Sequence, residues 1–134
     1  MDAAVLPLIV HLAVQPAVYP SGRPVVVSVA VTNPGSAPVD FTRYFTPFEP
    51  FAGPIFAVVA ADGVRVPYTG PMVKRKPPGK KDLIRIAAGE TLRVDVDLAQ
   101  AWAFPGPGTY DVTFTGANDP ERLPGSNTLK VVLE

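Results

Sequence analysis

The feature that most constrains the fold is a strict two-residue alternation of side chains in several short segments. In Val25–Thr32 every odd position is valine, and in Thr91–Leu98 every even position is leucine or valine while the odd positions are polar. Thr109–Phe114 alternates in a similar way. Successive side chains of a strand point to opposite faces, so these segments are predicted to be strands with one face toward a core.

Turn residues separate these segments. The 17 prolines and 11 glycines come close to the level typical of disordered chains, but they fall between β-branched runs, which is how an all-β chain places its turns. Two further strands are expected at Leu83–Ile86 and Leu129–Leu133, an edge strand at Leu8–Val14, and a central strand at Ile55–Ala60. Val39–Arg43 is expected to follow a turn and to pair with Val25–Thr32. Val64–Val66 is expected to be the second strand of a hairpin that turns at Asp62-Gly63.

This pattern of short strands and turns predicts an all-β fold. We expect an immunoglobulin-like antiparallel β-sandwich of about eight strands, forming a single domain over residues 1–134. The Gly-Thr-Tyr sequence ending at Tyr110 is typical of a corner at which a tyrosine hydroxyl bonds back to the main chain. Residues 99–104 are expected to form a short helical turn.

Composition excludes several classes of function. Twelve acidic and 12 basic residues give a net charge of zero, which provides no general attraction to nucleic acid or to an anionic membrane. The absence of cysteine rules out disulfides and thiolate chemistry. The apolar segment 1–14 is too short to span a bilayer and lacks the basic start of a signal peptide, so the compartment stays open.

Few residues suggest catalysis. His11 is the single histidine and lies in an expected strand, where an edge-exposed or hydrogen-bonded role is more common than metal ligation. Asp95 and Asp97 share one face of a strand, and we interpret them as a solvated surface; Asp119 and Glu121 lie in a polar loop. We therefore expect no enzyme activity, no cofactor and no metal site.

The most distinctive segment is Val66–Asp82, here called the basic loop. Five of the 12 basic residues lie within eight positions of it, at 74, 75, 76, 80 and 81, and prolines stand at 71, 77 and 78. Proline fixes φ and favours extended geometry in the residue before it, so the loop is expected to be stiff and protruding. Lysine-rich loops often serve solubility alone, but solubility does not require rigidity, whereas recognition benefits from it.

A second unusual segment, residues 44–53, combines four aromatic residues with two prolines. It cannot form a regular strand. Its phenylalanines at 45, 48 and 51 are expected to cap one end of the core, and partner binding is the less favoured alternative.

The sequence Val66-Pro-Tyr-Thr-Gly-Pro-Met-Val-Lys-Arg75, together with Asp62-Gly63 before it and Ile86-Ala-Ala-Gly-Glu-Thr-Leu92 after it, resembles the β-sandwich domain that precedes the catalytic domain of bacterial deuterolysin-like (M35) zinc metallopeptidases. The Ser21-Gly22 turn, Val31–Gly35 and Pro107–Tyr110 also agree with that pattern. The chain has no His-Glu-x-x-His sequence, so it resembles the pro-domain without its enzyme.

The resemblance implies a function. We expect a non-catalytic domain that binds and inhibits, or chaperones, a zinc metallopeptidase. Some peptidases of that family prefer lysine next to the cleaved bond, so Lys74 or Lys76 is expected to act as a substrate mimic. Two alternatives stay open: an immunoglobulin-like binding or adhesion module with another target, and a structural domain. The expected partner-binding residues are Tyr68, Gly70, Pro71, Met72, Val73, Lys74, Arg75, Lys76, Phe48 and Phe51.

Overall fold

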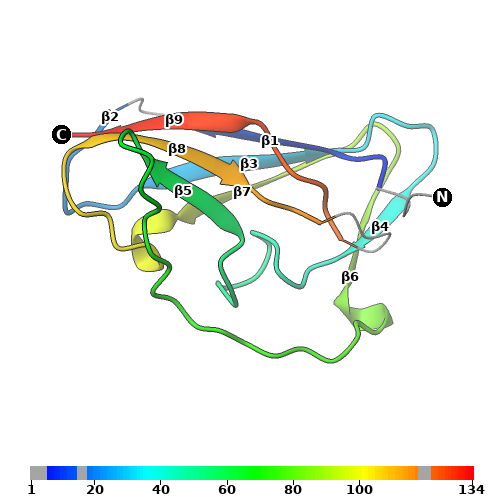
Figure 1. Cartoon of the computed structure of the whole chain (residues 1–134). Helices are drawn as coiled ribbons and strands as arrows, with labels where there is room; N and C mark the ends of the chain where they lie inside the picture. The colour runs from blue at the N-terminus through cyan, green and yellow to red at the C-terminus, as the bar shows by residue number, and fades with distance from the viewer. Residues whose placement is uncertain (1–5, 15–17, 118–121) are drawn as a thin grey trace.

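The computed structural model describes residues 6–14, 18–117 and 122–134, and nearly all of its regular structure is β-strand. Two sheets face each other with the core between them (Figure 1). The three-stranded sheet contains β1 (Ile9–Val14), β3 (Val26–Thr32) and β7 (Thr91–Asp97), in that order. The four-stranded sheet has the order β2 (Val18–Tyr19), β9 (Thr128–Leu133), β8 (Gly108–Phe114) and β5 (Phe56–Ala60).

Smaller elements complete the fold. A two-stranded sheet of β4 (Val39–Thr42) and β6 (Leu83–Ile86) lies at one end of the sandwich (Figure 1). The short 3-10 helix η1 (Lys80–Asp82) precedes β6, and η2 (Leu98–Gln100) follows β7. The strand pairs are antiparallel except for β2, which runs parallel to β9. No helix in the described ranges is long and apolar enough to cross a membrane.

The predicted alternation decides which side chains form the core. Val27, Val29 and Val31 are fully buried, while Ser28 and Ala30 between them are partly exposed. In the register of the sheet, Val29 lies opposite Leu12 of β1 on one side and opposite Val94 of β7 on the other. The all-β sandwich predicted from the sequence is thereby confirmed.

The tyrosine corner is also present. The Tyr110 hydroxyl donates a hydrogen bond to the Gly106 carbonyl over 2.6 Å, and its buried ring packs edge-on against Phe104. This bond attaches the start of β8 to the chain that leads into it. The predicted role of Tyr110 is therefore confirmed.

Three strand predictions need correction. Residues 39–43 do not pair with Val25–Thr32, because β4 pairs with β6 instead. The buried Asn33 side chain donates to the carbonyls of Ala37 and Ile86, which directs the chain away from β3. β5 lies at an edge of its sheet and not at its centre.

The third correction concerns the expected hairpin. The chain does turn at Gly63, whose φ of +86° suits glycine, but residues 64–66 form only an isolated bridge between Val59 and Arg65 and no strand. The expected helical turn at 99–104 is found slightly earlier, as η2.

Candidate functional site

The basic loop runs along the lower side of the sandwich, from below β5 to η1 (Figure 1), and its first half is hydrogen-bonded to the rest of the protein. The amide of Thr69 donates to the Ala101 carbonyl over 2.7 Å, and the amide of Val73 donates to the Ala52 carbonyl over 2.8 Å. Val66, where the loop starts, is buried in the core. These contacts fix the path of the loop without regular secondary structure.

Tyr68 shapes the first turn of the loop. Its ring packs edge-on against the buried Trp102 with ring centroids 5.0 Å apart, and its hydroxyl donates to the Pro71 carbonyl. Burial raises the pKa of this hydroxyl. Gly70 lies against the same ring, since a Cβ there would come within 2.7 Å of the tyrosine oxygen. Tyr68, Gly70 and Pro71 therefore hold the loop in shape.

Arg75 points into the protein. One of its terminal nitrogens lies 2.6 Å from a Glu49 carboxylate oxygen, and its guanidinium lies over the Tyr44 ring, 4.4 Å from the centroid. Glu49 is almost fully enclosed, with its side chain 2% exposed, and it also accepts the Phe45 amide over 2.7 Å. A charge in this position needs its partners, so the pair attaches the loop firmly to segment 44–53.

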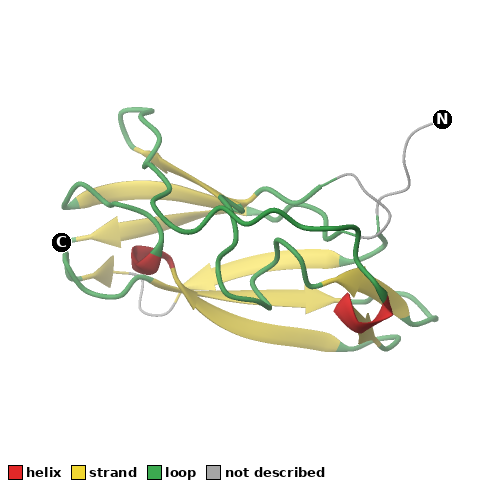
Figure 2. Cartoon of the chain, turned by 90° about the horizontal axis from the view of Figure 1, so that it is seen from below, coloured by secondary structure: helices red, strands yellow, loops and turns green. Residues whose placement is uncertain are grey.

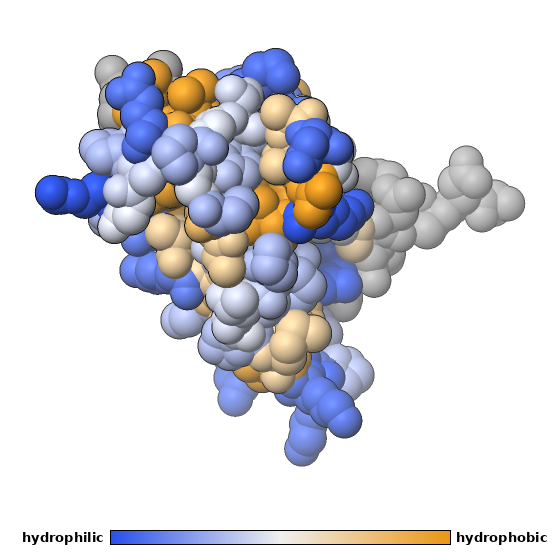
Figure 3. Space-filling view, turned by 60° about the vertical axis from the view of Figure 1, so that its left-hand side comes forward, coloured by the Kyte–Doolittle hydropathy of each residue, from blue (hydrophilic) through white to orange (hydrophobic). Residues whose placement is uncertain are grey.

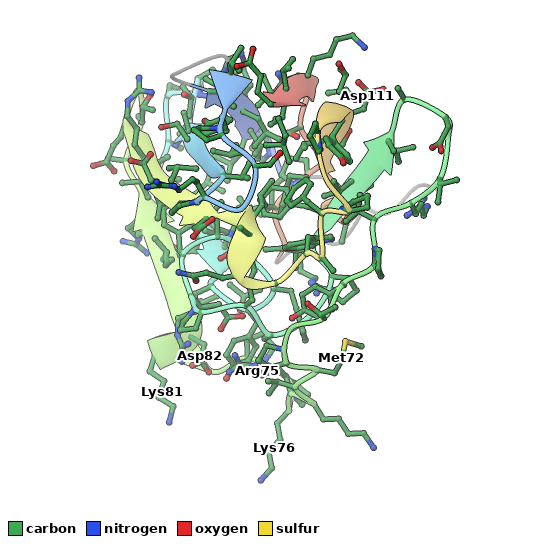
Figure 4. The ribbon with its side chains drawn as sticks, turned by 90° about the vertical axis from the view of Figure 1, so that its left-hand side faces the viewer. Met72, Arg75, Lys76, Lys81, Asp82 and Asp111 are labelled. Carbon is green, nitrogen blue, oxygen red and sulfur yellow. The ribbon has the colours of Figure 1, made fainter. Side chains whose placement is uncertain are left out.

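Asp82 closes the far end of the loop. It accepts the Gly79 amide over 2.9 Å and Arg43 over 3.0 Å, and Arg43 also reaches Glu49. The Gly79 amide, followed by the Tyr44 hydroxyl, lowers the pKa of Asp82. The same hydrogen bond with Asp82 raises the pKa of Tyr44. Figure 4 shows Arg75 and Asp82 close to the body of the protein.

The remaining side chains of the loop face solvent. Met72 is 73% exposed and Val73 42% exposed. The lysines at 74, 76, 80 and 81 are exposed, and none of them makes an ion pair within the described part of the chain. Lys76 and Lys81 extend away from the protein (Figure 4), and hydrophilic side chains gather at the narrow lower end of the molecule (Figure 3).

The phenylalanines of segment 44–53 are half-buried against the core. Phe48 packs on Phe41 with centroids 5.7 Å apart, and Phe51 packs edge-on against Trp102 at 5.2 Å. This is the expected capping arrangement. Phe51 packs on the same Trp102 ring that Tyr68 of the loop contacts. The expected role of Phe48 and Phe51 in partner binding stays a prediction.

Sequence reasoning missed the residues that hold the loop, above all Glu49, Tyr44 and Asp82. Glu49 is the single acidic residue in the aromatic and proline-rich segment 44–53, which is a signal for an internal partner. Because its partner Arg75 lies 26 positions later, no local pattern connects the two.

The carboxylates considered for catalysis have local structural roles. Asp95 accepts the Ser28 hydroxyl, and Asp97 accepts the amides of Val25 and Ala99. His11 is exposed on β1. Asp119 and Glu121 lie outside the described residues. Within the described ranges, no group of three or more histidine, aspartate or glutamate side chains is placed to hold a metal ion.

Comparison with known proteins finds a partial similarity to a protease. Over 88 residues, or 66% of this chain, the sequence is 31% identical to an extracellular protease of Aeromonas hydrophila. The chain spans about a quarter of the length of that relative, since the match covers 25% of it. No family model matches the chain. The chain is therefore related in sequence to part of a protease, and its fold is an all-β sandwich.

Proposed function

We propose that this protein is a non-catalytic, propeptide-like domain that binds and inhibits, or chaperones, a deuterolysin-like zinc metallopeptidase through its basic loop. The observation that carries the proposal is the similarity to an extracellular protease in a chain whose loop is held rigid with its lysines exposed. Within the domain of residues 1–134, the sandwich acts as the support and the loop as the binding element.

The rigidity of the loop supports this function. Both ends of the loop and its middle contact the rest of the protein: Tyr68 packs on Trp102, Arg75 pairs with Glu49, and Asp82 pairs with Arg43. A loop held in one conformation loses little entropy on binding, so more of its contact energy contributes to affinity. A loop that served solubility alone would need no such contacts.

The inward position of Arg75 determines what a partner meets. In extended backbone, neighbouring side chains point to opposite sides, so the contact of Arg75 with Glu49 directs Lys74 and Lys76 outward. The exposed Met72 and Val73 precede them and offer apolar contact. The proposed contact surface therefore consists of residues 72–74 and 76, with Arg75 as an internal anchor.

The resemblance to the deuterolysin-like pro-domain specifies the proposed mode of binding. Lys74 or Lys76 enters the pocket with which such a peptidase selects lysine next to the cleaved bond. Pro77 directly follows Lys76 and removes a backbone donor, which opposes productive cleavage there. The loop then occupies the site as a poor substrate.

Inhibition of a lysine-preferring deuterolysin-like peptidase tests the proposal. We would compare the wild-type domain with Lys74→Ala, Lys76→Ala and the double variant. Lys130→Ala on β9 is the matched control, since it removes an exposed lysine far from the loop. We expect inhibition that the double variant loses and the control keeps.

Other outcomes have clear meanings. Inhibition unaffected by the double variant would move the contact surface away from these lysines. Absence of inhibition at low and high salt would contradict the inhibitory function. Binding to acidic proteins in general that weakens steeply with salt would favour the alternative of a binding module that recognises surface charge.

A further inference from the structure

Strand β7 presents an open edge. It pairs with β3 alone among the described strands, and Figure 2 shows it running along the edge of its sheet into η2. Leu92, Val94 and Val96 on its core-facing side are only half-buried, whereas the valines opposite them on β3 are fully buried. The apolar surface of the sandwich is thus incompletely covered along β7.

The hydrogen bonds at both ends of β7 show which backbone groups are free. The Leu98 amide donates to the Val25 carbonyl, and the Asn33 amide donates to the Glu90 carbonyl. In an antiparallel pair the direction of the backbone groups alternates, so the even-numbered residues between these points face β3. The amides and carbonyls of Arg93 and Asp95, with those of Thr91 and Asp97, therefore point outward from the edge.

The sequence of this edge is complementary to itself. If two β7 strands pair antiparallel about Val94, Arg93 of each copy lies opposite Asp95 of the other, and Leu92 lies opposite Val96. The outward backbone groups then meet in hydrogen-bonded pairs, as an antiparallel ladder requires. A shift to the neighbouring allowed registers places Arg93 opposite Arg93 or Asp95 opposite Asp95, which like-charge repulsion disfavours.

The geometry points to a second copy of this chain as the partner of the β7 edge, forming a two-fold symmetric dimer with a continuous six-stranded sheet centred on Val94. Arg93 makes no ion pair within the described part of the chain, so it is available to the partner. A hollow of about 380 Å³ separates the end of β7 from Pro47 and Pro50 of segment 44–53.

The charges of Arg93 and Asp95 also make pairing with unrelated strands unfavourable. Charged side chains on an edge strand discourage pairing with unrelated chains. Here one register alone converts both charges into opposite-charge contacts. The proposed dimer surface contains no residue of the basic loop, and the dimer does not depend on the function proposed for that loop.

A cysteine cross-link tests the register directly. The chain has no cysteine, so Val94→Cys introduces one thiol at the proposed symmetry axis. Residues opposite each other in a non-hydrogen-bonded pair have Cα atoms about 4.5 Å apart, within the range of a disulfide. Under mild oxidation we expect a covalent dimer of Val94→Cys and none of the matched control Leu92→Cys, whose two copies lie far from each other in this register.

Exchange of the charges provides a second test that does not depend on a thiol. In sedimentation equilibrium we expect Arg93→Asp and Asp95→Arg each to weaken the dimer about tenfold, since each places like charges opposite one another twice. The double variant restores opposite charges and is expected to recover the wild-type affinity.

A wild-type protein that stays monomeric up to millimolar concentration would overturn the proposal. So would equal cross-linking of the two cysteine variants, or a double variant no tighter than the single ones. Cross-linking of Val94→Cys to a different protein in place of a second copy would show that the edge takes another strand, and would also contradict it.

Discussion

Glu49 links the basic loop to the sandwich, so its replacement tests the account of loop rigidity. Glu49→Gln keeps the size of the side chain and one acceptor for the Phe45 amide but removes the charge that holds Arg75 at 2.6 Å and Arg43 at 3.4 Å. A hydrogen bond to a charged group contributes about 1.5 to 3 kcal/mol. The two arginines are 24% and 38% exposed, so solvent screening reduces their share.

We therefore expect Glu49→Gln to lower the free energy of unfolding by about 2 kcal/mol. For a domain of this size that corresponds to a fall in Tm of about 6 °C. Urea unfolding followed by circular dichroism measures the change. Limited trypsin digestion measures how far the basic loop itself is loosened, because release of Arg75 exposes the peptide bonds after residues 74 and 75 to trypsin.

The matched control is Asp40→Asn, which breaks an ion pair with Arg85 on the exposed face of the small sheet. Its urea midpoint and digestion rate are expected to stay close to those of the wild type, because exposed pairs contribute little. The reasoning is refuted if Glu49→Gln matches the wild type in both measurements, since the loop would then be held by its other contacts.

Three further predictions concern single groups. Tyr110→Phe removes the corner hydrogen bond and is expected to lower the free energy of unfolding, measured in urea, by about 1 kcal/mol. An unchanged urea midpoint would show that this bond does not stabilise the fold. Gly70→Ala forces the Tyr68 ring to move, so the emission of Trp102 beside it should shift, and an unaltered spectrum would argue against the contact. The lowered pKa of Asp82 means that its carboxylate stabilises the fold above the ordinary value of 3.8 and that this contribution disappears as the pH falls through the lowered pKa. Asp82→Asn should therefore show less loss of stability on acidification than the wild type; equal acid sensitivity would contradict the assignment.

The sequence predicted the strands best where one face is polar and the other apolar. Val25–Thr32, Thr91–Leu98 and Thr109–Phe114 all contain strands with the expected inward faces. It failed where pairing depends on distant groups. Residues 39–43 formed a strand as expected, but the buried amide of Asn33 decides that β6 is its partner.

The candidate site shows the same division. The exposure of Lys74 and Lys76 and the stiffness of the loop follow from local composition. The inward position of Arg75 depends on Glu49, which is brought near only when segment 44–53 folds over the end of the core. Such a contact between distant segments has no local sequence pattern, so the sequence alone does not distinguish Arg75 from the exposed lysines on either side of it.

The measurement that tests the central claim most directly is amide hydrogen exchange of the domain with and without a catalytically inactive deuterolysin-like zinc peptidase. The account predicts that the peptidase slows exchange in residues 72–81 and leaves the strands of the sandwich unchanged. Slower exchange on a surface other than residues 72–81 would contradict this account. So would unchanged exchange throughout the domain at a peptidase concentration that saturates binding of the peptidase's own propeptide.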